Sequence, residues 1–205
     1  MAAVERLTSQ AVLLRDGTVQ LHGKSSLVVE TYLASVGAPT TGWVDVETEP
    51  RKYQGIGSAI ISKLRLHDSS GVVCGGQIMF DLLVKVLHQI DQLRVSFTIF
   101  DLAGMPVGSA FSNEINIAND SSSLILTITM DRIPLAPGEY YMGVSIGRGD
   151  FKSGHIDYDV VLDCMYFSVA ASAGRYGMLP TWERSWGSIV FDGVTLDISE
   201  PANAA

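Results

Sequence analysis

Residues 143–147 read GVSIG and match the G-x-S-x-G pattern that surrounds the nucleophilic serine of many hydrolases. That pattern supports catalysis only where a strand turns sharply into a helix and holds the serine above a parallel sheet. Here both glycines lie within a stretch of alternating apolar and polar residues, and RGDFKSG follows in place of a helix. The sequence therefore predicts that Ser145 is a hydroxyl on a strand surface, and it predicts no catalytic residue.

Three carboxylates, those of Asp157, Asp159 and Asp163, lie close together in the sequence. Two carboxylates at a suitable separation are enough for glycoside hydrolysis, so a carbohydrate-active enzyme stays open as an alternative. Carboxylates are common, however, and most of them face solvent. The sequence favours solvated loop acids, with one carboxylate at the end of a strand.

Other patterns for metal, nucleotide or redox chemistry are incomplete. None of the four histidines has another at the i+3 or i+4 spacing typical of metal ligands: His22, His67, His88 and His155. GIGSAI, at residues 55–60, lacks the third glycine of a dinucleotide-binding loop, and a strand pattern follows it. Cys74 and Cys164 are expected to be buried free thiols. No metal and no cofactor are therefore expected.

The composition is that of a globular protein, because 47% of the 205 residues are hydrophobic and 18% are charged. The formal net charge of -8 and the lack of Lys and Arg runs argue against nucleic acid as a partner. No apolar stretch approaches the roughly 20 residues that span a bilayer, and the N-terminus carries no export signal. A cytoplasmic location is expected.

The first 37 residues have a different pattern from the rest of the chain. A helix is expected over residues 2–8, a strand at AVLL, and a second helix at KSSLVVETYLA with Ser25 or Ser26 as its N-cap. Residues 38–56 carry prolines, glycines and charges without periodicity, as a linker does. We therefore expect an N-terminal segment at 1–37, a linker at 38–56 and one domain at 57–200.

Period-two alternation dominates the expected domain, and turn signals such as DLAG, NDSS and APGE separate the alternating stretches. Strands are expected near 58–67, 77–88, 93–101, 105–111, 123–130, 139–147, 160–169 and 188–197. Regular short strands with no helical pattern between them predict an all-β fold, an antiparallel β-sandwich, behind a short α/β N-terminal remnant.

The alternation also assigns the two faces of each strand. In the strand at 139–147, Tyr140, Met142, Val144 and Ile146 are expected to face the core. Outward positions in the three central strands mix aromatic, hydroxyl and charged side chains: Arg94, Ser96, Thr98, Phe100, Tyr141, Ser145, Cys164, Tyr166 and Ser168.

Two parts of the chain resemble one protein family. The N-terminal segment resembles the last segment of an ABC transporter ATPase, at positions Leu14, Gly17, Val19, Gly23, Val28 and Tyr32. FTIFDLAGMPV, IPLAPGEYYMGVSI, DYDVVLDCMYFSV and GMLPTW resemble, in that order, the C-terminal carbohydrate-binding domain of Wzt. Wzt is the ATPase subunit of bacterial O-antigen exporters.

The resemblance implies an immunoglobulin-like sandwich without catalytic activity, which forms a homodimer by exchanging a C-terminal strand. It implies recognition of the non-reducing end of a lipid-linked polysaccharide, so that finished chains are exported. An ABC permease and an ATPase body are the implied partners, and the implied location is cytoplasmic, peripheral to the inner membrane. The chain itself carries no P-loop. A purely structural dimerisation domain is the main alternative.

Sugar recognition needs aromatic surfaces and directed polar groups, and the outward side chains offer both. Arg94 suits an anionic terminal group, although the negative net charge leaves that open. The two tryptophans suit either a sugar platform or, as we favour, a dimer interface. The predicted carbohydrate-binding residues are Arg94, Phe100, Tyr141, Ser145, His155, Tyr166, Trp182 and Trp186, with Asp81 and Lys85 as further polar candidates.

Overall fold

The structure is a computed structural model of the 205-residue chain, and it describes residues 4, 7–15, 17–36, 42–67, 72–118, 122–171 and 182–191. The helical elements are α2 (Ser25–Val36) and the short 3-10 helix η1 (Arg184–Trp186). The strands are β1 (Gln10–Arg15), β2 (Thr18–Lys24), β3 (Val44–Asp45), β4 (Ala59–Leu66), β5 (Val72–Val73), β6 (Ile78–Val86), β7 (Gln92–Asp101), β8 (Pro106–Phe111), β9 (Ile115–Asn116), β10 (Ser123–Met130), β11 (Gly138–Asp150) and β12 (Gly154–Ala170). In these ranges no helix has the length and apolarity to cross a membrane.

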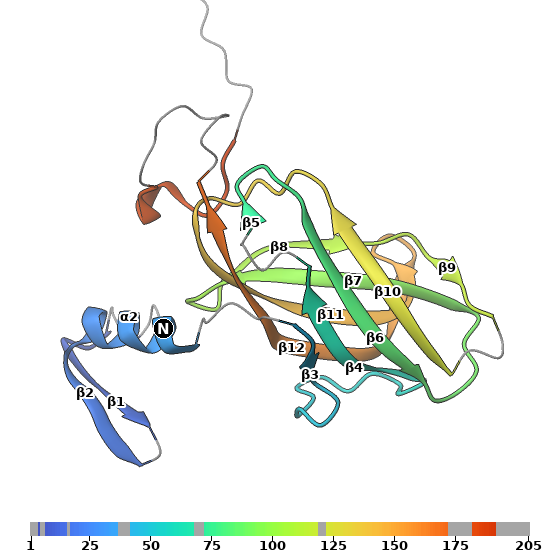
Figure 1. The fold of residues 1–205 in the computed structure, drawn as a ribbon, viewed down its shortest axis with the longest axis horizontal. Coiled ribbons are helices and arrows are strands. Elements are labelled where there is room, and N and C mark those ends of the chain that lie inside the picture. Colours follow the sequence, from blue (N-terminus) through green and yellow to red (C-terminus); the bar gives the residue numbers. More distant parts are fainter. Residues whose placement is uncertain are drawn as a thin grey trace, which may run out of the picture.

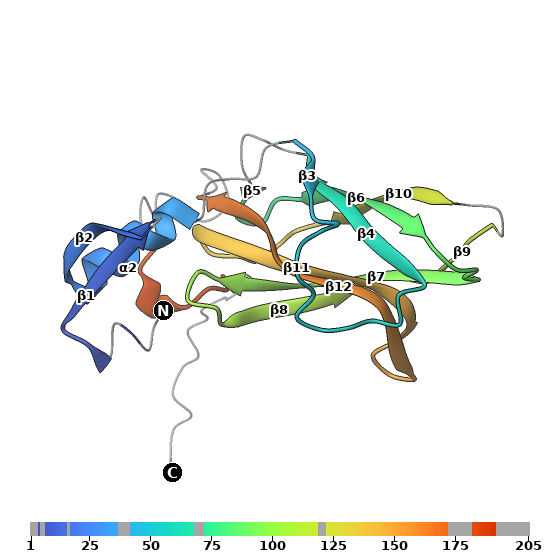
Figure 2. The ribbon, with the colours of Figure 1, turned by 90° about the horizontal axis from the view of Figure 1, so that it is seen from below.

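Two sheets form the body of the molecule and pack face to face (Figures 1 and 2). The four-stranded sheet has the order β10-β6-β4-β3, and the six-stranded sheet has the order β5-β12-β11-β7-β8, with β9 paired to β7. Neighbouring strands are antiparallel except β5, which runs parallel to β12. The predicted all-β sandwich is confirmed.

Seven of the predicted strands correspond to β4, β6, β7, β8, β10, β11 and β12. Strands β11 and β12 are longer than expected because the turn between them is tight. The Asp150 carboxylate accepts hydrogen bonds from the N–H groups of Lys152 and Ser153, at 2.8 and 2.7 Å. Of the strand predicted at 188–197, Ile189 forms a bridge with Leu135, and residues 192–197 lie outside the described ranges.

Residues 42–57, which we call the strap, contact both sheets. The Arg51 guanidinium binds the Asp159 carboxylate through Nε at 2.8 Å and Nη2 at 3.1 Å, and also donates to the carbonyls of Val46 and Ile61. Asp159 belongs to β12, and its Oδ2 accepts from the N–H of Ile61 in β4. Most of the predicted linker thus packs on the sandwich, while the domain limits stay a prediction.

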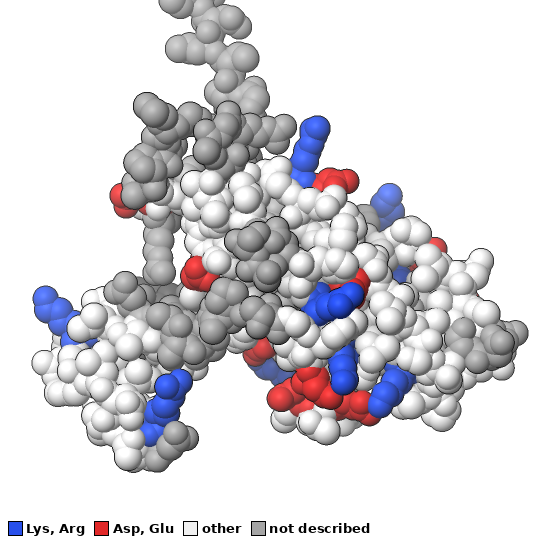
Figure 3. All heavy atoms as spheres, in the orientation of Figure 1, with Lys and Arg blue, Asp and Glu red and all other residues white. Residues whose placement is uncertain are grey.

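Acidic side chains gather around β3 with basic ones beside them (Figure 3).

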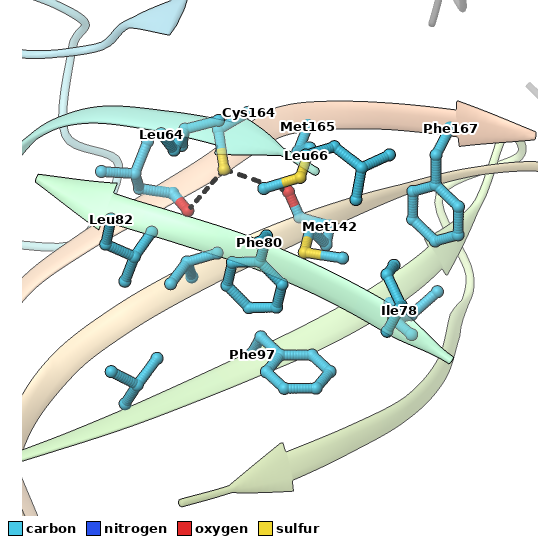
Figure 4. Close-up of a cluster of buried hydrophobic side chains, with 14 of the residues drawn as sticks. Leu64, Leu66, Ile78, Phe80, Leu82, Phe97, Met142, Cys164, Met165 and Phe167 are labelled. Atoms are coloured by element: carbon cyan, nitrogen blue, oxygen red, sulfur yellow. Dashed lines mark hydrogen bonds between the residues drawn. The ribbon is translucent and has the colours of Figure 1, made fainter. Parts of the chain in front are cut away.

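The core lies between the two sheets (Figure 4). Phe80 of the four-stranded sheet and Phe97 of the six-stranded sheet meet edge to face, with ring centroids 5.4 Å apart. The predicted inward set of β11 is confirmed, because all its members are buried: Tyr140, Met142, Val144 and Ile146. Alternation therefore assigns the faces of β11 correctly.

A bulge in β12 reverses one predicted side chain. Met142 pairs with Met165 and Val144 pairs with Val161, so three residues of β12 lie opposite Gly143. Asp163 takes a left-handed backbone conformation with φ of 53°, which turns Cys164 inward. The outward prediction for Cys164 is wrong: its thiol is buried and donates to the Met142 carbonyl at 3.3 Å (Figure 4).

The N-terminal segment is a β1–β2 hairpin with helix α2 packed beside it. The Ser25 hydroxyl, at the start of the helix, donates to the Thr8 carbonyl at 2.9 Å. Val28 and Val29 of α2 are buried. In contrast, several apolar side chains of this segment are exposed: Val12, Leu14, Val19 and Leu27. The segment therefore buries little apolar surface by itself.

Candidate functional site

Six of the eight predicted binding residues come from the three central strands of the six-stranded sheet. Arg94 and Phe100 lie on β7, Tyr141 and Ser145 on β11, and His155 and Tyr166 on β12. The structure separates them into two groups along β11. Asp81 and Lys85 belong instead to β6 of the other sheet.

The first group is an aromatic row formed by Phe100, Tyr141 and Tyr166. Tyr141 is the direct cross-strand partner of both other residues, so the three rings share one register across β7, β11 and β12. The Tyr141 ring stacks on Phe100 at 5.1 Å between centroids with an interplanar angle of 12°, and lies 5.4 Å from Tyr166 at 33°. All three side chains are partly exposed.

Because the rings stack on one another, Tyr141 has both of its faces covered by its neighbours. A ligand would therefore meet the exposed edges of these partly exposed rings. The row therefore offers hydrogen-bonding groups and apolar edges together, rather than one open aromatic platform.

Asp163 supplies a carboxylate to the aromatic row. The β12 bulge places this exposed residue near the row, where its charge acts on both tyrosine hydroxyls. Burial first, and then the charge of Asp163, raises the pKa of Tyr141 to about 12. Burial followed by Asp163 also raises the pKa of Tyr166. Both hydroxyls thus keep their protons at neutral pH and can donate as well as accept.

The second group is the Arg94 cluster, formed by Arg94, Ser96, Ser145, Asp157 and Phe111. Arg94 is only 1% exposed, although it points away from the core. Its Nη2 binds Asp157 Oδ1 at 2.6 Å, and its Nη1 binds the Ser96 hydroxyl at 2.9 Å. The guanidinium lies over the Phe111 ring, 5.1 Å from its centroid. Direct contact between Arg94 and an anionic ligand is therefore blocked in this structure.

Ser145 completes the hydrogen bonding of this cluster. It is 9% exposed, lies 2.7 Å from the Ser96 hydroxyl, and donates to Asp157 Oδ1 at 3.2 Å. The antiparallel strand and these bonds do not fit a nucleophile held by a base above a parallel sheet, but Ser145 is buried among its partners and not on the strand surface as predicted.

His155 lies at the margin of the Arg94 cluster, next to Phe111. The Phe111 ring is 5.7 Å from His155 and 5.8 Å from Phe151, which is largely exposed. Sequence reasoning missed Phe111 and Ser96 as site residues and considered Asp157 only as an acid. Strand parity had marked Ser96 as outward, whereas nothing in the sequence indicated that Phe111 would cover Arg94.

Two glycines of β11 allow β12 to lie close beside it. A Cβ at Gly143 would approach Leu162 Cδ2 to 2.6 Å, because the β12 bulge brings Leu162 over that position. A Cβ at Gly147 would lie 2.2 Å from the Ile156 carbonyl oxygen. The glycines of GVSIG therefore have a steric role in the pairing of β11 with β12.

Trp182 and Trp186 lie together and come after β12 in the sequence. Their rings meet edge to face at 5.4 Å, and Trp182 Nε1 donates to the Gly187 carbonyl at 2.7 Å. Trp182 packs against the core, whereas Trp186 is more than half exposed. Among the described residues, no hydrogen bond or ring contact joins the pair to the aromatic row or the Arg94 cluster.

A separate polar network lies on the four-stranded sheet. The buried Asp81 carboxylate accepts from Arg65 Nε and His67 Nε2 at 2.8 Å each, and from the Thr127 hydroxyl at 2.7 Å. Lys85 binds Glu47 at 2.6 Å. Neither sequence-predicted candidate on this sheet is brought near the aromatic row.

Comparison with known proteins identifies one family. Residues 51–179 match the family described as the Wzt C-terminal domain. A crystal structure of the C-terminal domain of Wzt is 16% identical, with a TM-score of 0.56, over 75% of this chain and 96% of that one. The CARDB domain of a Pyrococcus furiosus protein, solved with di-metal ions, is 15% identical over 53% of this chain and 87% of that one, with a TM-score of 0.31. No curated protein sequence matches significantly.

Proposed function

Because the chain belongs to the Wzt C-terminal domain family, we propose that it binds a polysaccharide without chemically altering it. The observation that carries this proposal is the aromatic row with Asp163 beside it. The row combines partly exposed ring edges with two protonated phenols and a carboxylate, the groups that hold C–H edges and hydroxyls of a sugar.

The finer proposal is that the ligand is the non-reducing end of a lipid-linked, O-antigen-type glycan that an ABC transporter exports. The exposed apolar side chains of the N-terminal segment support a partner on that side. They adjoin a hollow of about 500 Å³ lined by Leu14, Leu21 and Tyr32 among others. An ATPase body is the proposed partner, which would place the chain in the cytoplasm at the inner membrane.

We also propose a homodimer with exchange of the C-terminal strand. A hollow of about 670 Å³ opens between β10 and the β8–β9 segment, and core-facing Leu93, Val95 and Leu126 line it. β10 pairs only with β6 among the described strands, and its sequence, SLILTITM, has no charge to protect the edge. Residues 191–197, which follow the bridge of Ile189 with Leu135, are the part of the expected strand that we propose for this open edge.

Binding to the polysaccharide made by the same cells tests the main proposal. Isothermal titration calorimetry of Tyr141→Ala should show at least about tenfold weaker binding, equivalent to about 1.4 kcal/mol. Tyr141→Phe keeps the ring and separates the part due to the hydroxyl, and Tyr53→Ala is a control at an exposed tyrosine outside the row.

Three outcomes would decide against the proposal. Unchanged affinity in folded Tyr141→Ala would remove the aromatic row from the binding site. Shortened or modified polysaccharide after incubation would favour the carbohydrate-active enzyme, and a dimer that binds no polysaccharide at all would favour the structural dimerisation domain.

A further inference from the structure

From the Arg94 cluster we infer a second sugar subsite on the same sheet, which takes an uncharged sugar unit and uses Asp157 as the hydroxyl acceptor. This inference rests on the proposed function. It concerns Asp157, Phe151 and His155, which lie apart from the aromatic row, and it defines the charge of the ligand unit bound there.

The charge balance of the cluster excludes an anionic group as its natural ligand. The positive charge of Arg94 is buried and is already paired with Asp157. Among the described residues, its Nη1 and Nη2 atoms bind only groups within the cluster. Its Nε is buried without a hydrogen-bond partner. A second carboxylate, that of Glu114, is held nearby by the Gly149 N–H. An incoming anion would therefore meet negative charge before it met the guanidinium.

The atom of the Arg94 cluster that remains to bind a ligand is a hydrogen-bond acceptor, a carboxylate oxygen of Asp157. Asp157 Oδ1 is occupied by Arg94 and Ser145, but Oδ2 has no hydrogen-bond partner among the described residues. The Asp157 side chain is 30% exposed, so a ligand can reach this second oxygen. A carboxylate oxygen accepts from hydroxyl groups, and sugars present these in neighbouring pairs. Arg94 acts as the positioning residue that fixes the carboxylate.

Aromatic side chains extend from this acceptor toward the β11–β12 turn. The Phe111 ring, which lies under Arg94, contacts both His155 and Phe151, and Phe151 is 67% exposed at the turn. An aromatic side chain beside a directed carboxylate suits a sugar ring, which has C–H faces as well as hydroxyls. Lys152 lies 5.6 Å from the Phe151 ring and is the cation that an acidic sugar would use instead.

The spacing of the two groups allows one chain to reach both. Tyr141 and Ser145 are four residues apart on β11, which corresponds to about 13 Å along an extended strand. Gly143 lies between them, covered by Leu162. A short oligosaccharide laid along β11 could contact the aromatic row with one unit and the Arg94 cluster with another.

Saturation-transfer NMR with the intact chain tests the inference. The probes are methyl glycosides of neutral hexoses and 6-deoxyhexoses beside the matching hexuronates and sugar phosphates. We expect binding of at least one neutral probe, with shifts of the Phe151 and His155 ring resonances and weaker or no binding of its acidic counterpart. Phe151→Ala and Asp157→Asn should each weaken the neutral probe about fivefold or more, whereas Lys152→Ala should leave it unchanged.

Phe151→Ala keeps the test valid if Asp157→Asn fails to fold, because Phe151 is largely exposed. The inference is overturned if acidic probes bind more tightly and Lys152→Ala abolishes their binding, or if no neutral probe binds. It is also overturned if Phe151→Ala binds the whole polysaccharide as well as the wild type does. In that last case Tyr141→Ala still tests the proposed function, so the two failures are distinguishable.

Discussion

Two glycines of β11 determine how closely β12 can approach. We expect alanine at the two positions to destabilise the protein to different degrees. In Gly143→Ala the new methyl group would meet the end of the Leu162 side chain, which can move, so we expect a loss of about 1 kcal/mol. In Gly147→Ala it would meet the backbone carbonyl of Ile156, and we expect a loss of about 3 kcal/mol. Urea denaturation measures both.

Gly108→Ala is the matched control, because a Cβ at this strand position would meet nothing within 4 Å. It should be neutral or slightly stabilising, since alanine restricts the unfolded chain more than glycine does. Equal stability of Gly147→Ala and Gly108→Ala would contradict the pairing of β11 with β12 described above.

Asp81 gives an expectation for pH dependence. Burial alone raises the pKa of this carboxyl, but hydrogen bonds from His67, Thr127 and Arg65 outweigh burial and hold its pKa below the usual value. A carboxyl with a lowered pKa in the folded state adds stability above its unfolded pKa of about 3.9, and that stability is lost as the pH falls through the folded pKa.

Asp81→Asn should therefore cost about 1 to 3 kcal/mol at pH 6 through weakened hydrogen bonds. The difference from the wild type should begin to shrink below about pH 4, where Asp81 of the unfolded chain takes up a proton, and should shrink further as the pH falls toward the lower folded pKa. Urea midpoints measured for both proteins from pH 6 to pH 3 give this difference directly. A difference that stays constant over the whole range would show that the charge of Asp81 is not what stabilises the network.

Single residues of the site were predictable only where strand parity decides their position. Phe100, Tyr141 and Tyr166 fall on one outward face because each strand alternates regularly at those positions. The burial of Arg94 was not predictable, because its partner Asp157 lies 63 residues away in the sequence and Phe111 comes from another strand. Such contacts depend on tertiary pairing, which alternation does not encode.

The strap gives an expectation for one structural element. Arg51→Ala would leave Asp159, whose side chain is 6% exposed, without its cation, and removing one partner of a buried ion pair costs about 3 to 5 kcal/mol. Lys63→Ala is the control, since its partner Asp45 is 3.9 Å away and both side chains are largely exposed. Chemical denaturation should show the large loss for Arg51→Ala only, and similar small losses for both would mean that the strap stabilises little.

Among the elements, long alternating strands were predictable, whereas irregular ones were not. The bulge at Asp163 adds two residues to β12 and turns Cys164 inward, an effect that the sequence CMYFSV does not reveal. The two-residue strands β3, β5 and β9 are too short to show alternation. The strap has the composition of a linker, and contacts between residues far apart in the sequence, such as Arg51 with Asp159 and Val44 with Leu64, place it on the sandwich.

For the molecule as a whole, the proposed strand exchange predicts a change of mass. A chain that ends after Phe191 should be a monomer by size-exclusion chromatography with light scattering, whereas the full chain should be a dimer. A chain that ends after Glu200 keeps residues 188–197 and should remain a dimer. A dimer that survives loss of residues 192–205 would exclude exchange of this strand.

The strap also determines how a pull on the N-terminal side reaches the sandwich. Tension applied to the chain ahead of Trp43 first loads the pairing of Val44 with Leu64, and then the bonds of Arg51 to Asp159 and to the backbone of Ile61. These contacts join β3, β4 and β12, so the load is shared between the two sheets before any core strand is displaced. The strap is thus the mechanical coupling through which motion of an attached partner would reach the domain.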